Sequence, residues 1–511
     1  MRLLRLLKRP EAALFALAFV AYAYFYQAGG WNQNVRFDLV RSLVEKRTTI
    51  IDGYHVNTGD LSCYGDNGRC IRARPQLHEH YYCDKAPGVS LLGIPPYIVF
   101  HVFASKSPSE RYLTWASYVS TLTAVAIPSA LGLVMLFMLL IALGLRRWHA
   151  VALALGYGFA TLSFPYSTLF YGHQTAAALL VAAFALLVRA RHVEGARPYL
   201  GLVGVFLGFS VVSEYPAALG VIPITIYAAV YFRPWKRLIW FAVGGAACAA
   251  LLAAYHWAAF GGPLTLPYEA STQKFRTLGY FMGLGAPNYE AFSNTLWTSY
   301  RGLFFSSPWL LLAFPGAFFM LRRRRYRAEA IVSLAIFGLF VWMTASLLES
   351  WHGGWGLGAR YLLPAIPFLV ILIAGFVLPA RQDRARRPTT PRDRWIKRGS
   401  YAAYIGLTGY SALLMLGGTA VRPEVPQHIK KPFSQYLMPN FYEGNLSINP
   451  QAITMIVAPR GKPPAKAFNL GQLIGLKGIP SLLPMFLLMA GAMVWFIRVG
   501  KRAPEPESER P

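Results

Sequence analysis

Residues 112–145 read YLTWASYVSTLTAVAIPSALGLVMLFMLLIALGL, and this stretch contains no Asp, Glu, Lys, Arg or His. One helical crossing of the hydrocarbon core of a membrane takes about 20 mainly apolar residues. At 34 residues the stretch is long enough for two short crossings with a break near Pro128, because proline lacks the N–H that a helix needs. The stretch therefore predicts that this chain lies in a membrane.

Apolar runs of this kind recur along the whole chain of 511 residues. Hydrophobic residues make up 55% of it and charged residues only 14%, whereas soluble domains carry about 25% charged residues. This composition excludes a water-soluble enzyme, and it excludes a disordered chain, which would be poor in apolar residues. We expect an all-α multi-pass membrane protein whose other spans lie at 10–27, 87–104, 150–165, 173–189, 199–213, 216–232, 237–259, 305–321, 328–348, 361–379, 400–418 and 481–498.

The formal net charge of +28 indicates how the chain sits in the membrane. Short cytoplasmic loops of membrane proteins collect Lys and Arg, and here the basic residues gather between apolar runs, at 146–149, 190–198, 233–237, 322–327 and 381–398. A nucleic-acid binder would instead carry a basic stripe on a soluble fold, so we expect no nucleic-acid partner. The pattern favours a membrane protein with both termini in the cytoplasm.

The positions of the basic loops divide the chain into external and membrane segments. Because the basic loops must all lie on the cytoplasmic side, the number of crossings before residue 146 has two possible solutions. Either 112–145 crosses twice and the chain has about 14 crossings, or 87–104 is re-entrant and it has about 12. The expected segments are a first span at 1–27, an external loop at 28–86, a bundle at 87–418 with external loops at 260–304 and 349–360, a further external loop at 419–480, a last span at 481–498 and a disordered cytoplasmic tail at 499–511.

The first external loop opens with RFDLVRSLVE at residues 36–45. Its apolar side chains recur at helical spacing, which predicts an amphipathic helix lying on the membrane surface. The helix would hold Asp38 at the level of the lipid headgroups. A carboxylate there can act as a general base toward a hydroxyl, or ligate a divalent cation that grips a phosphate. The alternative is an interfacial helix whose charges face water.

The same loop closes with HYYCDKAPG at residues 80–88, directly before an apolar run. The ammonium of Lys85 would be well placed to bind a lipid phosphate, or it could be a membrane anchor that reaches toward water. Within the loop, Cys63 and Cys70 could form a disulfide, which an external segment permits. Another pairing with Cys83 stays open.

These two motifs together resemble the GT-C superfamily of polyprenyl-phosphate-dependent glycosyltransferases. The resemblance is to the branch with protein O-mannosyltransferases and bacterial lipid A aminoarabinose transferases. Members have an acidic residue in the first external loop, matched by Asp38, and a Lys-Pro-Pro-type closing motif, matched by Lys85-Ala86-Pro87. The chain departs from the pattern because the closing motif reads Lys-Ala-Pro-Gly and because Leu39 follows Asp38, so the acidic pair of some members is absent. Motif support is concentrated in residues 36–95.

Two later external stretches, YRGLFFSSP at 300–308 and ESWHGGWGLGARY at 349–361, open apolar runs. Uncharacterised bacterial membrane proteins of the GT-C-like group carry similar stretches. Glycines allow close approach of a ligand to the backbone, aromatic rings can stack on a sugar or form an interfacial belt, and arginines can fork onto a phosphate. The candidate substrate-binding residues are Lys85, Arg36, Asp84, Tyr82, Arg301, His352, Trp351, Arg360 and Tyr361, with Glu214 and His173 as further candidates beside the catalytic Asp38.

The sequence contains no Walker-type phosphate loop, Rossmann fingerprint or HExxH motif. The resemblance implies an inverting transfer of a sugar from a polyprenyl-phosphate donor to a hydroxyl on a lipid, glycan or protein acceptor at the external face. No cofactor is implied with certainty, and a divalent cation stays open. The alternatives are a transporter or flippase of a lipid-linked sugar, and an O-antigen-type polymerase or ligase.

Overall fold

A computed structural model describes residues 8–103, 108–191, 197–273, 281–378, 391–455 and 466–502 of the chain. The basic blocks expected at 190–198 and 381–398 lie partly outside the described residues. In the expected tail at 499–511, only residues up to 502 are described.

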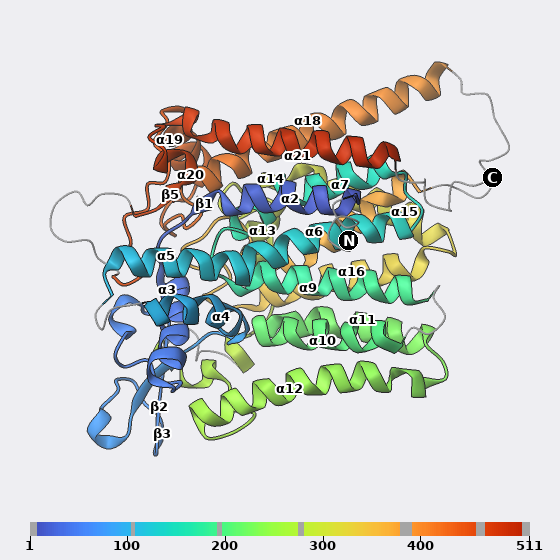
Figure 1. Cartoon of the computed structure of the whole chain (residues 1–511). Coiled ribbons are helices and arrows are strands. Elements are labelled where there is room, and N and C mark those ends of the chain that lie inside the picture. The colour runs from blue at the N-terminus through green and yellow to red at the C-terminus, as the bar shows by residue number, and fades with distance from the viewer. Residues whose placement is uncertain are drawn as a thin grey trace.

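Long helices lie side by side and form the body of the molecule (Figure 1). Their apolar side chains build one large core that runs through the bundle. Within the described ranges, six helical segments are long and apolar enough to cross a membrane: Glu110–Ala142, Gly172–Ala190, Trp235–Phe260, Arg327–Ser346, Tyr401–Val421 and Ile479–Lys501. The bundle helices are α2 (Pro10–Ala23), α5 (Glu110–Thr121), α6 (Ile127–Ala142), α7 (Arg147–Phe159), α9 (Gly172–Ala190), α10 (Arg197–Ser213), α11 (Ala218–Tyr231), α12 (Ile239–Phe260), α15 (Ala313–Arg322), α16 (Arg327–Ser346), α17 (Ile366–Ile373), α18 (Pro391–Val421) and α21 (Leu483–Arg502).

The stretch at 112–145 is one continuous helix rather than two crossings. α5 passes into α6 through a π-helical turn at Leu122–Ala126. Such a turn interrupts the regular α-helical hydrogen-bond pattern, and Pro128 lies just beyond it, so the N–H that proline lacks falls where that pattern is already interrupted. The expected break at Pro128 is therefore wrong. A single helix here favours the alternative in which 87–104 is re-entrant. α4 (Gly88–Phe103) packs beside α3 (Trp31–Arg41) and α5.

The polar segments gather at one end of the bundle, which we call the loop end (Figure 1). It holds two small antiparallel sheets: β1 (Phe25–Tyr26) pairs with β5 (Phe468–Asn469), and β2 (Leu61–Gly65) pairs with both β3 (Gly68–Arg69) and β4 (His80–Cys83). The short helices there are α3 (Trp31–Arg41), α8 (Ser163–Tyr166), α13 (Tyr289–Leu296), α14 (Leu303–Ser306), α19 (Met438–Tyr442) and α20 (Leu470–Leu473).

Helix α3 differs from the expected surface helix. It begins at Trp31 rather than Arg36, and its side chains from Asn32 to Val40 are all buried. α4 and the segment carrying Ile453 cover one side of it, and the β2–β4 sheet covers another. This helix is therefore buried by the other segments of the loop end and not by lipid.

Cys63 and Cys70 form the expected disulfide, and Cys83 and Cys248 are free and buried. The bond closes a short loop in the β2–β3 hairpin, so it restricts the unfolded chain only locally. We expect the double replacement Cys63→Ser/Cys70→Ser to lower the free energy of unfolding by about 2–3 kcal/mol, measured by thermal unfolding in detergent. Cys248→Ala is the control because it removes a thiol outside any disulfide. Equal stability of the double variant and the control would contradict the prediction.

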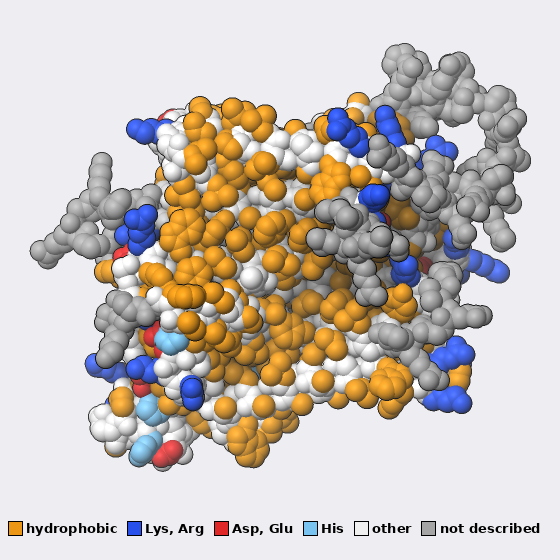
Figure 2. All heavy atoms as spheres, in the orientation of Figure 1, with side chains coloured by type: hydrophobic (Ala, Val, Ile, Leu, Met, Phe, Trp, Pro, Cys, Tyr) orange, Lys and Arg blue, Asp and Glu red, His pale blue; other side chains and the backbone are white. Residues whose placement is uncertain are grey.

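The outer surface fits a lipid environment. Figure 2 shows hydrophobic side chains across the middle of this face, with Lys and Arg toward the two ends. Large apolar residues are exposed on several bundle helices, for example Ile226 at 60%, Trp257 at 63% and Leu487 at 63%. Apolar surface of this extent is unfavourable in water. Together with the membrane-length helices, it identifies an integral membrane protein.

Candidate functional site

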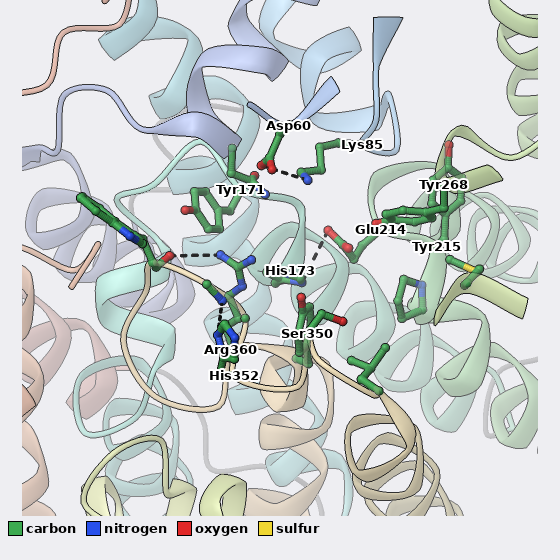
Figure 3. Close-up of a pocket in the computed structure, with 18 of the residues that line it drawn as sticks. Asp60, Lys85, Tyr171, His173, Glu214, Tyr215, Tyr268, Ser350, His352 and Arg360 are labelled. Atoms are coloured by element: carbon green, nitrogen blue, oxygen red, sulfur yellow. Dashed lines mark hydrogen bonds and ion pairs between the residues drawn. The ribbon is translucent and has the colours of Figure 1, made fainter. Parts of the chain in front are cut away.

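A cavity of about 980 Å³ opens at the loop end, between α3, the β4–α4 connection, the start of α9, α11, α16 and the segment that leads into α17. Polar and charged side chains from distant parts of the sequence meet there (Figure 3). They include Asp60, Lys85, His173, Glu214, Arg360 and Glu424.

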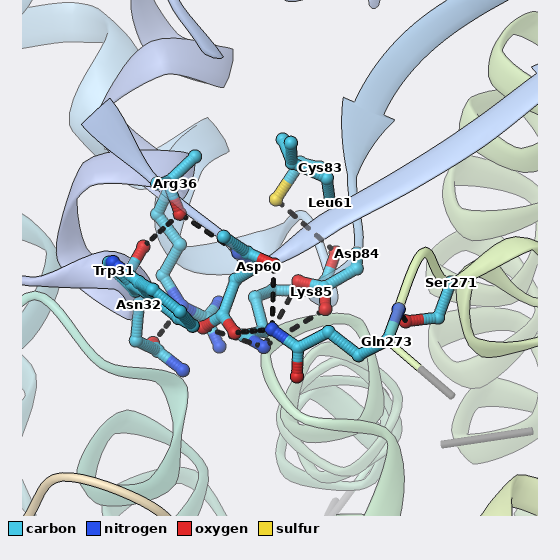
Figure 4. A network of polar contacts seen from close by, with 12 residues as sticks. Trp31, Asn32, Arg36, Asp60, Leu61, Cys83, Asp84, Lys85, Ser271 and Gln273 are labelled. Carbon is cyan, nitrogen blue, oxygen red and sulfur yellow. Dashed lines mark hydrogen bonds and ion pairs between the residues drawn. The ribbon is translucent and has the colours of Figure 1, made fainter. Parts of the chain in front are cut away.

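Lys85 is held between two carboxylates (Figure 4). Its Nζ lies 3.0 Å from Asp60 Oδ2 and 3.0 Å from Asp84 Oδ1. Lys85 is 4% exposed and Asp84 is fully buried. Burial lowers the pKa of Lys85 from its ordinary value, and the charge of Asp60 opposes that shift. This ammonium is thus already neutralised by protein groups before any substrate arrives.

A second ion pair forms the wall next to it. Arg36 Nη2 lies 3.3 Å from Glu214 Oε2, and His173 Nδ1 lies 3.5 Å from the same oxygen. Arg36 also donates to Asn32 Oδ1 at 3.0 Å and to the carbonyl oxygen of Ala86 at 2.9 Å. Arg36 does not itself line the cavity. It fixes Glu214 from behind and ties α3 to the segment that carries Lys85.

Arg360 lies below Tyr171 in the view of Figure 3, beside His352. Its guanidinium contacts the faces of Tyr171 and Tyr361, with centroid distances of 5.3 and 5.4 Å. Its hydrogen bond is a long one of 3.4 Å to the carbonyl oxygen of Trp355, and its Nε has no partner. Among the described residues, no carboxylate forms an ion pair with Arg360. It is therefore a partly buried cation that can bind an anionic group.

The glycine-rich segment before Arg360 wraps around this guanidinium. Gly353 and Gly354 have φ values of 71° and 64°, which favour glycine. A Cβ on Gly353 would lie 2.8 Å from Arg360 Nε. Arg301, which is 2% exposed, holds the segment by donating to the carbonyl oxygens of Gly354, at 2.7 Å, and Gly356. Arg301 therefore shapes the loop and does not line the cavity.

Glu424 comes from the segment after α18 and lines the opposite side of Tyr171. Its Oε1 accepts a hydrogen bond of 2.6 Å from the hydroxyl of Tyr171, and its Oε2 accepts one of 3.0 Å from Gln33. The residue is 3% exposed, and burial raises its pKa to about 7. In the described part of the chain, no cation lies within ion-pair distance of this carboxylate.

Asp38, the expected catalytic carboxylate, is not among the residues that line the cavity. It is fully buried, its Oδ1 accepts from Asn57 at 3.0 Å, and its Oδ2 has no partner. Burial raises its pKa well above the ordinary value. The expectation that Asp38 and Lys85 share a pocket is wrong for the described residues. The reason is helical geometry, because Asp38 is rotated by about 200° from Arg36, which faces the cavity wall.

The other predicted residues divide into two groups. His352 and Tyr361 line the cavity, and burial lowers the pKa of His352 to about 4, so its neutral Nδ1 accepts from the N–H of Gly354 at 2.9 Å. Tyr82 and Trp351 do not line it. The ring of Tyr82 packs on Phe260 at 5.3 Å, and that of Trp351 stands edge-on to Tyr300 at 6.2 Å.

The sequence analysis assigned no role to several residues that form the site, namely Trp31, Asp60, Tyr171, Tyr268 and Glu424. Asp60 belongs to a Thr-Gly-Asp stretch in the first external loop, which was the available signal. No motif surrounds Glu424, which reaches the cavity because the chain after α18 folds back over α3. A Cβ on Gly30, at the start of α3, would lie 2.3 Å from Glu424 Oε2.

The sequence left a divalent cation open. Over the described ranges, no group of three or more His, Cys, Asp and Glu side chains lies together in a way that could hold a metal ion.

No family model matches the chain, and no curated protein matches it. Solved structures do. The chain is similar to ArnT from Cupriavidus metallidurans. In the apo state the TM-score is 0.47, with 15% identity, 94% of this chain covered and 73% of that chain. For the same protein bound to undecaprenyl phosphate the TM-score is 0.45, with 14% identity and coverages of 96% and 74%.

An archaeal oligosaccharyltransferase, AglB from Archaeoglobus fulgidus in complex with an inhibitory peptide and a dolichol-phosphate, gives a TM-score of 0.46 with 12% identity. It covers 89% of this chain and 61% of that one. Both proteins are GT-C glycosyltransferases, the superfamily that the first external loop resembles. At these identities, and at TM-scores below 0.5, the likeness by itself assigns no activity. The function proposed below therefore rests on the residues of the cavity.

Proposed function

We propose that the protein is a membrane glycosyltransferase that moves a sugar from a polyprenyl-phosphate donor to an acceptor hydroxyl, with inversion. The observation that carries this proposal is a cation and a carboxylate that line one cavity, each without an ion-pair partner in the described part of the chain. Arg360 has no carboxylate partner among the described residues, and Glu424 has no cation partner there. A reaction that releases an anionic phosphate and takes a proton from a hydroxyl needs one group of each sign.

The apolar wall of the cavity supports a lipid-linked donor. Leu219 of α11 and Trp342, Met343 and Leu347 of or beside α16 line it. Trp342 lies within a membrane-length helix and is 51% exposed. A residue that faces both the cavity and the lipid marks a lateral entrance. A prenyl chain can enter there while its phosphate stays with the polar groups of the loop end.

The leaving phosphate would bind at Arg360. Charge develops on that phosphate as its bond to the sugar breaks, and a preorganised cation in a cavity of low dielectric stabilises it strongly. A guanidinium can form two parallel hydrogen bonds to a phosphate. Lys85 would contribute more weakly, because Asp60 and Asp84 already occupy its ammonium.

We also propose that the loop end faces the periplasm of a bacterial inner membrane and that both termini are cytoplasmic. Basic residues flank the bundle helices at the opposite end, for example Arg147 at the start of α7, Arg189 near the end of α9 and Arg322 at the end of α15. This distribution follows the positive-inside rule. At an external face no nucleotide sugar is supplied, whereas a sugar on a flipped polyprenyl phosphate is available.

The test uses the purified full chain in liposomes that contain radiolabelled undecaprenyl-phosphate sugars and a membrane extract as the source of acceptors. We expect label to move from the donor to an acceptor and free undecaprenyl phosphate to appear. Movement of intact labelled donor between leaflets without release of undecaprenyl phosphate would instead identify a flippase. Growth of the label into long polymers would identify a polymerase.

A further inference from the structure

Among the described residues, most charged side chains that line the cavity form ion pairs with one another or with a neighbour. Asp60 pairs with Lys85, and Glu214 pairs with Arg36 and His173. Glu349 is exposed, so water can solvate it. Within the described ranges this leaves Glu424 as the buried carboxylate of the cavity with no ion-pair partner, and Arg360 as its guanidinium with none.

Tyr171 separates these two unmatched groups. Its hydroxyl donates to Glu424 Oε1 at 2.6 Å, while its ring centroid lies 5.3 Å from the guanidinium carbon of Arg360. The hydroxyl and the ring face of one tyrosine side chain therefore contact the two groups. A sugar bound beside Tyr171 would have a cation on one side and a carboxylate on the other.

The carboxylate of Glu424 is held in a fixed orientation by neutral donors. Tyr171 binds one oxygen and Gln33 binds the other. Each oxygen keeps a second lone pair for a further hydrogen bond. Gly30 leaves room for the carboxylate, because any Cβ at that position would collide with it.

We propose that Glu424 is the general base that takes the proton of the acceptor hydroxyl. This inference rests on the proposed glycosyl transfer. In the step, the acceptor oxygen forms a bond to the anomeric carbon as its proton passes to the carboxylate of Glu424. The bond between that carbon and the phosphate oxygen breaks, and its electron pair leaves with the phosphate, which Arg360 holds. Atoms and charge balance without any further reactant.

The other carboxylates of the cavity are less suited to this role. Asp60 and Glu214 each form an ion pair, with Lys85 and with Arg36, so their carboxylates are already engaged by protein cations. Burial raises the pKa of Glu424 to about 7, and the groups that oppose this shift are Tyr171, Gln33, Arg422 and Arg360. A base with a pKa near the working pH is the most effective.

The first experiment compares wild-type protein with Glu424→Gln and Glu424→Asp in the liposome assay across pH. A base must be deprotonated, so wild-type transfer should fall as the pH drops below about 7. Glu424→Gln should lose transfer by roughly 10²–10⁴-fold and lose this acidic limb, and Glu424→Asp should keep part of both. Binding of undecaprenyl phosphate, measured by quenching of tryptophan fluorescence, should be unchanged in Glu424→Gln.

A second variant tests the position of the group without removing it. Gly30→Ala pushes against the Glu424 carboxylate, whereas a Cβ on Gly53 meets nothing within 4 Å. Gly30→Ala should reduce transfer and keep undecaprenyl-phosphate binding, and Gly53→Ala should behave as wild type. In infrared spectra taken on either side of neutral pH, a carboxyl band should titrate in wild-type protein and be missing in Glu424→Gln.

The outcomes separate the base from the function. If Glu424→Gln transferred sugar at the wild-type rate and still lost activity at low pH, Glu424 would not be the base, and the proposed transferase function would stand. Absence of the titrating carboxyl band would overturn the role of Glu424 as well. The proposed function itself would be wrong if the wild-type protein bound undecaprenyl phosphate but only moved intact donor between leaflets.

Discussion

Arg360→Ala is expected to lower sugar transfer by roughly 10²–10³-fold, the loss seen when one group that stabilises a developing oxyanion is removed. In this cavity, Arg360 is the guanidinium without a carboxylate partner among the described residues, and Tyr171 and Tyr361 hold it in place. Its loss removes the positive charge that faces the leaving phosphate. Affinity for undecaprenyl phosphate should fall together with the rate, and both are measured on the same preparation.

Arg360→Lys separates charge from geometry at this site. An ammonium keeps the positive charge but cannot form the two parallel hydrogen bonds of a guanidinium. We expect the Lys variant to recover part of the binding and less of the rate. Arg322→Ala, an exposed arginine at the end of α15, is the matched control. If Arg360→Ala bound undecaprenyl phosphate as tightly as this control, Arg360 would not be the phosphate ligand.

Lys85→Met is expected to destabilise the protein by about 3–5 kcal/mol, because removal of one partner leaves buried carboxylates without a counter-charge. The side chains of Lys85 and Asp84 are 5% and 0% exposed, and that of Asp60 is 10% exposed. Thermal unfolding in detergent measures the loss. The replacement should also reduce transfer, since displaced carboxylates alter the wall of the cavity.

A double variant distinguishes a structural lysine from a substrate-binding one. Lys85→Met/Asp60→Asn removes one of the stranded charges, so it should recover part of the stability that Lys85→Met loses. Lys236→Met, an exposed lysine at the start of the segment leading into α12, is the control. Full stability of Lys85→Met with no effect of the added Asp60→Asn would mean that Lys85 serves the substrate rather than the fold.

Much of the bundle follows from the sequence, because lipid demands long apolar segments and helices satisfy their own backbone hydrogen bonds. The chief error concerns Pro128. Proline was expected to break the helix, but a π-helical turn accommodates it, and no pattern in the sequence marks that turn. The small sheets of the loop end are too short to give a clear alternation.

Local motifs drew attention to Lys85, His352 and Arg360, which line the cavity, because each lies in an unusual polar or glycine-rich stretch that interrupts apolar sequence. The motif around Asp38 was misleading. Its side chain points away from the cavity, and Asp60 takes the place beside Lys85. The direction of a side chain on a buried helix depends on what packs around that helix, and a single sequence does not contain that information.

The sequence by itself determined that this protein lies in a membrane, that its polar segments gather between particular spans, and that Cys63 can reach Cys70. Each of these depends on residues close together in the chain and on transfer of side chains between water and lipid. Only the tertiary structure decided that Glu424 and Arg360 face one cavity from either side of Tyr171. The reason is that their approach depends on helices packed from distant parts of the chain, and on which buried charges find a partner there.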